Sequence, residues 1–198
     1  MILDIKPPSD PLLLKEIDPF DFSNPPCDPT ELANNLIETM TKHQGLGLSA
    51  NQCGLPYRVF VLWSETPLVC FNPRIVDQTS EFVLLDEGCL TFPNLFVKIK
   101  RPKAVKVRFQ DAKGDTHTEK FIGMTARAFL HEMDHLDGIL FHKRASGPHL
   151  SRALNQQKIL ERRLKRGEVV LRPREVNLTE QQLTLNTSDR TMTLGQGV

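Results

Sequence analysis

The sequence lacks any apolar run long enough to span a membrane, and its charges nearly balance. Its first ten residues contain no basic segment followed by an apolar core, and they lack the Arg and Ser content of a transit peptide. The formal net charge is +1, so nothing indicates nucleic acid or an anionic membrane as the main partner. We therefore expect a cytoplasmic protein that binds neither of them directly.

The sequence also lacks a C-x-x-C pair, internal repeats and a phosphate-binding loop. Four cysteines are present: Cys27, Cys53, Cys70 and Cys89. Their spacing does not indicate the disulfide framework of a secreted protein, so a reducing compartment is expected. The glycines of Gly45–Gln52 do not have the Gly, Lys and Ser spacing that cradles phosphate, and locally they predict a tight loop.

The chain of 198 residues is long enough for one domain with a hydrophobic core. Prolines in residues 1–28 predict an extended arm. Asp28 as cap and Pro29 at the first helical position then predict a helix that ends near His43. Strand-like segments rich in Val, Ile and Phe follow: Arg58–Trp63, Val69–Val76, Glu81–Leu85, Leu95–Lys100, Val105–Gln110 and Thr116–Ile122. Short strands followed by one long helix predict an α+β fold.

The composition changes after Phe141. A charged segment, Ser151–Lys165, predicts a solvated surface helix with a broken apolar stripe of Leu150, Leu154, Leu160 and Leu164. Residues 170–198 are polar and weakly patterned, as in a peripheral tail. We expect a catalytic domain at 1–147 and a peripheral helix and tail at 148–198.

The segment from Met124 to Phe141 carries the motif His-Glu-Met-Asp-His at His131–His135. It begins with good helix formers, and Gly138 is a suitable stop. Residues i and i+4 share a helix face, so both histidines can bind one transition metal. Glu132 can then act as general base on a water. The five residues alone are also compatible with a pair of histidines that only packs.

A third ligand has to decide between these interpretations, and three residues are candidates. His142 is one residue beyond the position that the metzincin pattern requires, which rotates it by about 100° on a helix. Glu161 lies in a basic segment that is typical of a solvated surface. Cys89 follows an apolar strand and a glycine, where a cysteine can be a ligand or a small buried apolar residue.

Three ordered segments together resemble the peptide deformylase family. The family pattern G-φ-G-φ-A-A-x-Q corresponds to Gly45–Gln52, E-G-C-L-S to Glu87–Thr91, and H-E-x-D-H to His131–His135. The resemblance covers about residues 1–145. It implies an α+β domain in which antiparallel β-sheets pack around a central helix that carries the HEMDH motif.

The resemblance also implies roles for single residues. Cys89, His131 and His135 would be the metal ligands, and Glu132 the general acid/base. The side chain of Gln52 and the backbone N–H of Leu90 would stabilise the oxyanion of a formyl group. The implied reaction removes the formyl group from N-terminal formylmethionine and releases formate.

The implied metal is one divalent ion, physiologically Fe²⁺, with Zn²⁺, Ni²⁺ or Co²⁺ able to replace it. The implied substrates are N-formylmethionyl nascent peptides, met in proximity to the ribosome. The backbone of Gly45 and Gly47 would pair with the peptide as an added strand. The pocket for the methionine side chain would be lined by Leu46, Met124 and Ala128.

Three residues depart from the family pattern. Ser49 replaces the first alanine, Thr91 replaces a serine, and Leu130 stands where glutamine commonly precedes the first histidine. None removes a ligand, the glutamate or the glutamine. A zinc endopeptidase that uses Glu161 and a non-catalytic module that binds formylated N-termini remain as alternatives. The sequence also predicts a buried Glu87–Arg101 pair beside Cys89 and a structural role for Asp134.

Overall fold

The computed structural model describes residues 1–64 and 66–169, and its first regular helix begins where the sequence predicts it. Helix α1 (Pro29–Lys42) follows a short 3-10 turn, η1 (Pro11–Leu14), in the N-terminal arm. The side chain of Asp28 accepts hydrogen bonds from the first free N–H groups of α1, those of Thr30 and Glu31. The buried residues of α1 form one stripe: Leu32, Ala33, Leu36, Thr39 and Met40.

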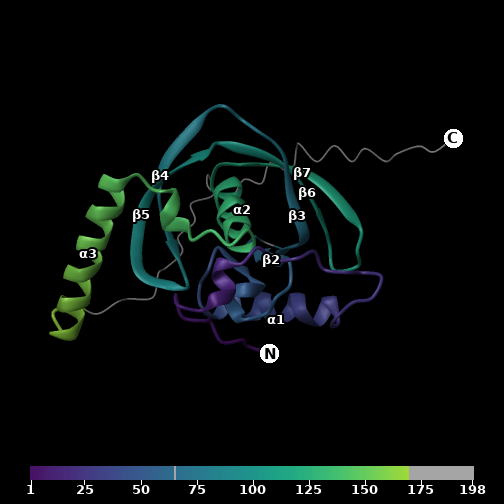
Figure 1. Cartoon of the computed structure of the whole chain (residues 1–198), viewed down its shortest axis with the longest axis horizontal. Helices are drawn as coiled ribbons and strands as arrows, with labels where there is room; N and C mark the ends of the chain where they lie inside the picture. Colours follow the sequence, from purple (N-terminus) through teal and green to yellow (C-terminus); the bar gives the residue numbers. More distant parts are fainter. Residues whose placement is uncertain (65, 170–198) are drawn as a thin grey trace.

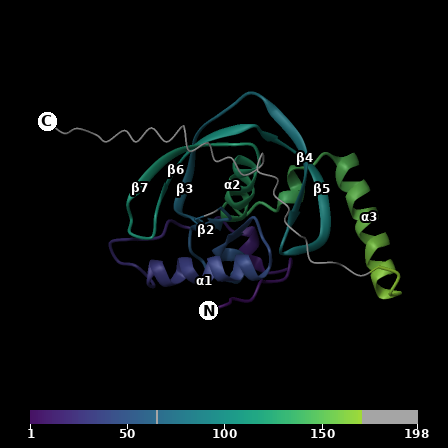
Figure 2. The same ribbon diagram turned by 180° about the vertical axis from the view of Figure 1, so that it is seen from behind.

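Within the described residues, seven strands form two antiparallel sheets, as expected for the α+β class (Figures 1 and 2). The five-stranded sheet has the order β1 (Gly47–Ser49), β2 (Val59–Leu62), β3 (Leu68–Gln78), β6 (Ala104–Gln110) and β7 (Thr116–Ile122). The two-stranded ribbon pairs β4 (Phe82–Cys89) with β5 (Phe92–Pro102). All six predicted strands are present. The segment predicted as a tight loop contains the further strand β1 and the first three residues of the 3-10 turn η2 (Ala50–Cys53).

Helix α2 (Gly123–Leu136) lies in the middle of the molecule, with the strands arching around it (Figure 1). Its apolar side chains pack against one face of the large sheet, for example Phe129 against Phe60 and Phe121. Helix α1 covers the other face of that sheet at Val59 and Val61. Because helices cover both faces there, strand β2 is apolar throughout.

Gly138 ends helix α2 as predicted. It has φ +69°, and it donates to the carbonyl of His135 while Ile139 donates to that of Asp134. This is the Schellman pattern, which places glycine at the left-handed position after a helix. The cap fixes where the chain leaves the histidine-bearing turn of α2.

Helix α3 (Gly147–Lys165) follows the 3-10 turn η3 (Phe141–Arg144) and begins four residues earlier than the predicted Ser151. It lies beside β5 (Figure 2). The buried contact is made by Ala153, whereas Leu154 of the predicted stripe is 40% exposed. The division at residue 147 stays a prediction, and the predicted tail at 170–198 lies outside the described residues. No helix in the described part of the chain has the length and apolar character needed to cross a membrane.

Candidate metal centre

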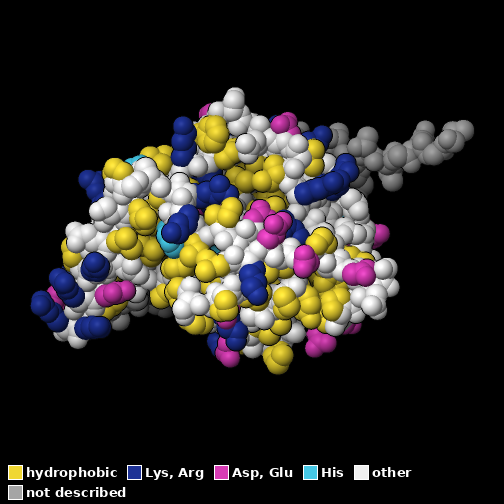
Figure 3. Space-filling view, in the orientation of Figure 1, with side chains coloured by type: hydrophobic (Ala, Val, Ile, Leu, Met, Phe, Trp, Pro, Cys, Tyr) yellow, Lys and Arg dark blue, Asp and Glu magenta, His cyan; other side chains and the backbone are white. Residues whose placement is uncertain are grey.

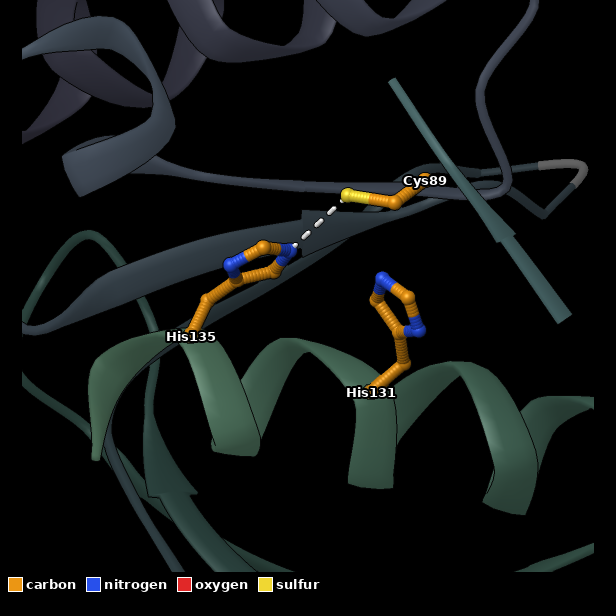
Figure 4. A group of neighbouring side chains, drawn as sticks. All are labelled: Cys89, His131 and His135. Atoms are coloured by element: carbon orange, nitrogen blue, oxygen red, sulfur yellow. Dashed lines mark hydrogen bonds between the residues drawn. The ribbon is translucent and has the colours of Figure 1, made fainter. Parts of the chain in front are cut away.

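Cys89 lies together with His131 and His135, although it precedes both histidines by more than 40 positions in the sequence. The histidines project from the same face of α2, one turn apart, and each turns a ring nitrogen towards the sulfur of Cys89 at the end of β4 (Figure 4). One ligand atom from each residue lies within 4.8 Å of the others. His135 Nε2 is 3.2 Å from Cys89 Sγ.

This donor set fits a divalent transition metal. A thiolate and two imidazoles suit zinc, iron, nickel or cobalt, and none of these side chains is used in a disulfide. Three protein ligands leave a coordination position open, which distinguishes catalytic from structural sites. Glu161, the alternative third ligand, is exposed on α3, and His142 packs against Phe92 instead. The choice among the three candidates therefore falls on Cys89.

Glu87 contacts the ring of His131 and orients it. Its Oε2 lies 3.1 Å from His131 Nδ1, which directs the Nε2 of His131 towards the sulfur. Arg101 donates to both oxygens of Glu87 at 2.9 Å, which confirms the predicted buried pair. Burial would raise the pKa of Glu87, but hydrogen bonds from His131 and Arg101 outweigh it and lower the pKa to about 2. The carboxylate is therefore charged at neutral pH.

The pKa values of the two histidines are shifted in opposite directions. Burial would lower the pKa of His131, but contacts with Cys89 and Glu87 outweigh it and raise the pKa to about 10. Burial, together with the charges on His131 and Arg101, lowers the pKa of His135 well below its usual value.

Asp134 points away from the cluster, as its place on the helix predicts. It accepts from Arg101 Nη1 at 2.7 Å and from Arg144 Nη2 at 2.7 Å. Arg101 therefore joins Asp134 of α2 to Glu87 of β4, and all three side chains are at least 94% buried. This network fixes the helix that carries the histidines to the strand that carries the cysteine.

Gln52 faces the cluster from η2. Its Oε1 accepts from the backbone N–H and the hydroxyl of Ser49, both at 3.0 Å. Its Nε2 therefore points the other way, 3.4 Å from Cys89 Sγ and 3.2 Å from Thr91 Oγ1. The amide N–H group is thus held as a donor beside the metal ligands.

Glu132 is 4% exposed and lies close to the backbone of Gly47. A Cβ atom at Gly47 would come within 2.5 Å of Glu132 Oε1, so only glycine leaves room for the carboxyl group. Burial raises the pKa of Glu132 to about 7. Within the described chain, Glu132 Oε2 has no hydrogen-bond partner, so one oxygen is available to a ligand.

A cavity of about 480 Å³ opens over the cluster. Its wall includes four residues with a predicted role in catalysis or metal binding: Gln52, Cys89, His131 and Glu132. Leu90, in the turn between β4 and β5, lies on the same wall. The residues expected to bind substrate also line it: Gly45, Leu46, Gly47, Met124 and Ala128. Their individual roles stay predictions.

Sequence reasoning missed two buried residues of the site. Arg127 donates to Glu87 Oε1 at 2.6 Å and to the carbonyl of Ile99, and Asn51 donates to the carbonyl of His135 at 2.6 Å. An isolated arginine in a helix usually predicts a surface position. The position of Arg127 in the sequence could have indicated this role, because it lies four residues before His131 and therefore on the same face of the helix.

Comparison with known proteins gives the family that the three sequence motifs resemble, and the match extends over most of the chain. The model of the polypeptide deformylase family matches residues 2–150. A peptide deformylase of Thermotoga petrophila is 40% identical over 138 residues, which cover 69% of this chain and 83% of the relative.

Solved structures of peptide deformylases are also similar to this chain. The crystal structure of peptide deformylase from Thermus thermophilus superposes with a TM-score of 0.74 at 32% identity, and the match covers 85% of this chain and all of that one. A class I type b peptide deformylase from Acinetobacter baumannii, bound to Met-Ala-Ser, gives a TM-score of 0.69 at 29% identity. That match covers 73% of this chain and 98% of that one.

Proposed function

The chain belongs to the peptide deformylase family, and from this premise we propose that Cys89, His131 and His135 hold its metal ion. The protein is a metal-dependent hydrolase that removes the N-formyl group from the N-terminal formylmethionine of newly made polypeptides and releases formate. The observation that carries the residue assignment is the convergence of one sulfur and two imidazole nitrogens within 4.8 Å.

A divalent ion held by Cys89, His131 and His135 would activate a water molecule, because such an ion lowers the pKa of bound water towards neutrality. We propose Fe²⁺ as the physiological ion, with Zn²⁺, Ni²⁺ or Co²⁺ as replacements. The mixed sulfur and nitrogen ligand set supports this proposal, since it accepts each of these ions.

Glu132 is the general acid/base in this proposal. Its buried carboxyl group lies beside the metal ligands, with Oε2 directed to no other partner in the described chain. It can therefore take a proton from water at Oε2 and hold it in a site shielded from solvent. It then gives the proton to the amine that leaves the formyl group.

Gln52 and Leu90 stabilise the charge that develops on the formyl oxygen. Two hydrogen bonds from Ser49 hold Oε1 of Gln52, so the Nε2 group keeps its orientation without reorganising during the reaction. The backbone N–H of Leu90 is the second donor in this proposal, and Leu90 lies on the wall of the same cavity.

The substrate enters as an extended peptide. We assign the backbone of Gly45 and Gly47 to peptide pairing, and Leu46, Met124 and Ala128 to the methionine side chain. The placement of all five on one cavity wall supports this assignment. We further propose that the protein works in the cytoplasm close to the ribosome, where formylated N-termini emerge.

The ligand assignment is tested by metal content. Cys89→Ala should reduce iron retained after anaerobic purification from about one ion per chain to a small fraction of it, because two imidazoles alone bind weakly. Cys27→Ala, which changes a cysteine outside the cluster, should retain the full amount. Full retention by Cys89→Ala, measured by elemental analysis, would refute the assignment.

A further inference from the structure

The β4–β5 ribbon has an exposed face that begins in the catalytic cavity. The strand register places three pairs on this face: Gly88 with Phe96, Asp86 with Lys98, and Leu84 with Lys100. Gly88, Phe96 and Asp86 line the catalytic cavity. The Leu84–Lys100 pair lies farther along the ribbon, so the face leads away from the reaction centre.

A second hollow lies at the far end of this face. It has a volume of about 570 Å³, and its floor consists of Phe82, Leu84, Lys98 and Lys100. Its wall comes from Arg144–Ser146 and His149, where η3 passes into α3. We call this cavity the ribbon hollow. On this side of the molecule, basic side chains lie next to hydrophobic ones (Figure 3).

The floor of the ribbon hollow is apolar and accessible. Phe82 and Leu84 are each 45% exposed, which is high for large apolar side chains that stand two residues apart on one strand. They offer contact area for an apolar side chain of a ligand.

The charge of the ribbon hollow favours an acidic ligand. The Nζ of Lys100 stands 5.0 Å from the centre of the Phe82 ring, and it forms no ion pair with any residue in the described chain. Lys98 has only an exposed pair with Asp86, at 3.4 Å, which solvent screens. A carboxylate beside Lys100 would therefore gain a charged partner that is not already taken.

We propose that the ribbon hollow binds the substrate polypeptide at about its sixth and seventh residues, counting the formylmethionine as the first, and that it favours an apolar residue followed by an acidic one. Leu84 lies four positions before Gly88 on β4, roughly 13 Å at the usual rise of a strand. An extended substrate needs about four residues for that distance, added to the two or three that occupy the catalytic cavity. The proposal rests on the deformylase function, because the same exposed face joins the two cavities.

The test compares formate release from four formylated peptides by the full-length, Fe²⁺-loaded enzyme. One is formyl-Met-Ala-Ser. The other three have eight residues and carry Leu-Glu, Leu-Lys or Ser-Ser at positions six and seven. The Leu-Glu peptide should exceed the other two in kcat/KM by about five-fold through a lower KM, as expected for a contact worth about 1 kcal/mol.

Two variants and one control locate the effect. Lys100→Glu should reverse the preference between Glu and Lys, and Leu84→Ser should reduce the advantage of Leu-Glu over Ser-Ser. Lys106→Glu, an equal charge change on β6 outside the ribbon hollow, should leave the preference unchanged. All three variants should process formyl-Met-Ala-Ser at the wild-type rate, because none touches the catalytic cavity.

Equal kcat/KM for the three longer peptides, or an unchanged preference in Lys100→Glu, would overturn the proposal. A photoreactive residue in place of Leu84 should become linked to the peptide. Linkage instead to residues 170–198 or to a second chain, at saturating peptide, would overturn it too. Failure to hydrolyse formyl-Met-Ala-Ser would contradict the deformylase function itself, and this separates the two claims.

Discussion

At the scale of single residues, Ser49 is the departure from the family pattern with the most direct connection to the site. The sequence alone presents it as a small residue in place of another small residue. In the structure it is fully buried, and its hydroxyl lies 3.0 Å from Gln52 Oε1. This chain therefore holds the side chain of Gln52 with one more hydrogen bond than an alanine at position 49 would allow.

Ser49→Ala should lower kcat by about five-fold with little change in KM, since a net hydrogen bond contributes about 1 kcal/mol. The backbone N–H of Ser49 would still hold Gln52, so activity should not disappear. Steady-state formate release measures both constants. Ser151→Ala, on the exposed face of α3, is the control, and an identical kcat in the two variants would show that the hydroxyl does not position Gln52.

At the scale of elements, Arg101 connects the ribbon with the central helix. Arg101→Met should destabilise the fold by about 3–5 kcal/mol, because it leaves Glu87 and Asp134 as buried carboxylates without this partner. Urea unfolding measures the difference. Lys103→Met is a matched control, because its pair with Glu81 is exposed and should contribute less than about 1 kcal/mol. Similar losses in both variants would contradict the structural role of Arg101.

The end of α2 gives a second prediction at this scale. A Cβ at Gly138 would lie 2.8 Å from the backbone carbon of Lys15, and the residue has φ +69°. Gly138→Ala should therefore cost more than the roughly 1–2 kcal/mol of left-handed backbone strain. Gly167 has the same φ with no atom within 4 Å, so Gly167→Ala measures the strain alone. Equal losses of unfolding free energy in the two variants, measured in urea, would show that the N-terminal arm shifts to make room for the added methyl group at Gly138.

The elements also show how far local sequence can predict the fold. The cap at Asp28 and the stop at Gly138 were predictable because their hydrogen bonds are local. Strand β4 was predicted to end at Leu85 but continues to Cys89, since pairing with β5 outweighs the poor strand preference of residues 86–88. Strand β1 was missed because its three residues are held by β2 rather than by their own pattern.

At the scale of the whole molecule, the site is built from three distant segments. The convergence of Cys89, His131 and His135 was predictable, because three ordered motifs together resemble one family. Arg127 and Asn51 were not, because their roles depend on contacts with Glu87 and His135 that only the folded chain creates. The ribbon hollow likewise depends on how α3 lies beside β5, which no local pattern encodes.

Formate release by Glu132→Gln measures whether Glu132 moves the proton in a metal-dependent deformylation. Fe²⁺-loaded wild-type protein should release formate from formyl-Met-Ala-Ser under anaerobic conditions. Glu132→Gln, which keeps the size of the side chain, should retain one metal ion per chain and lose activity by at least about 100-fold. Formate release by the metal-loaded variant at the wild-type rate would show that Glu132 does not move the proton.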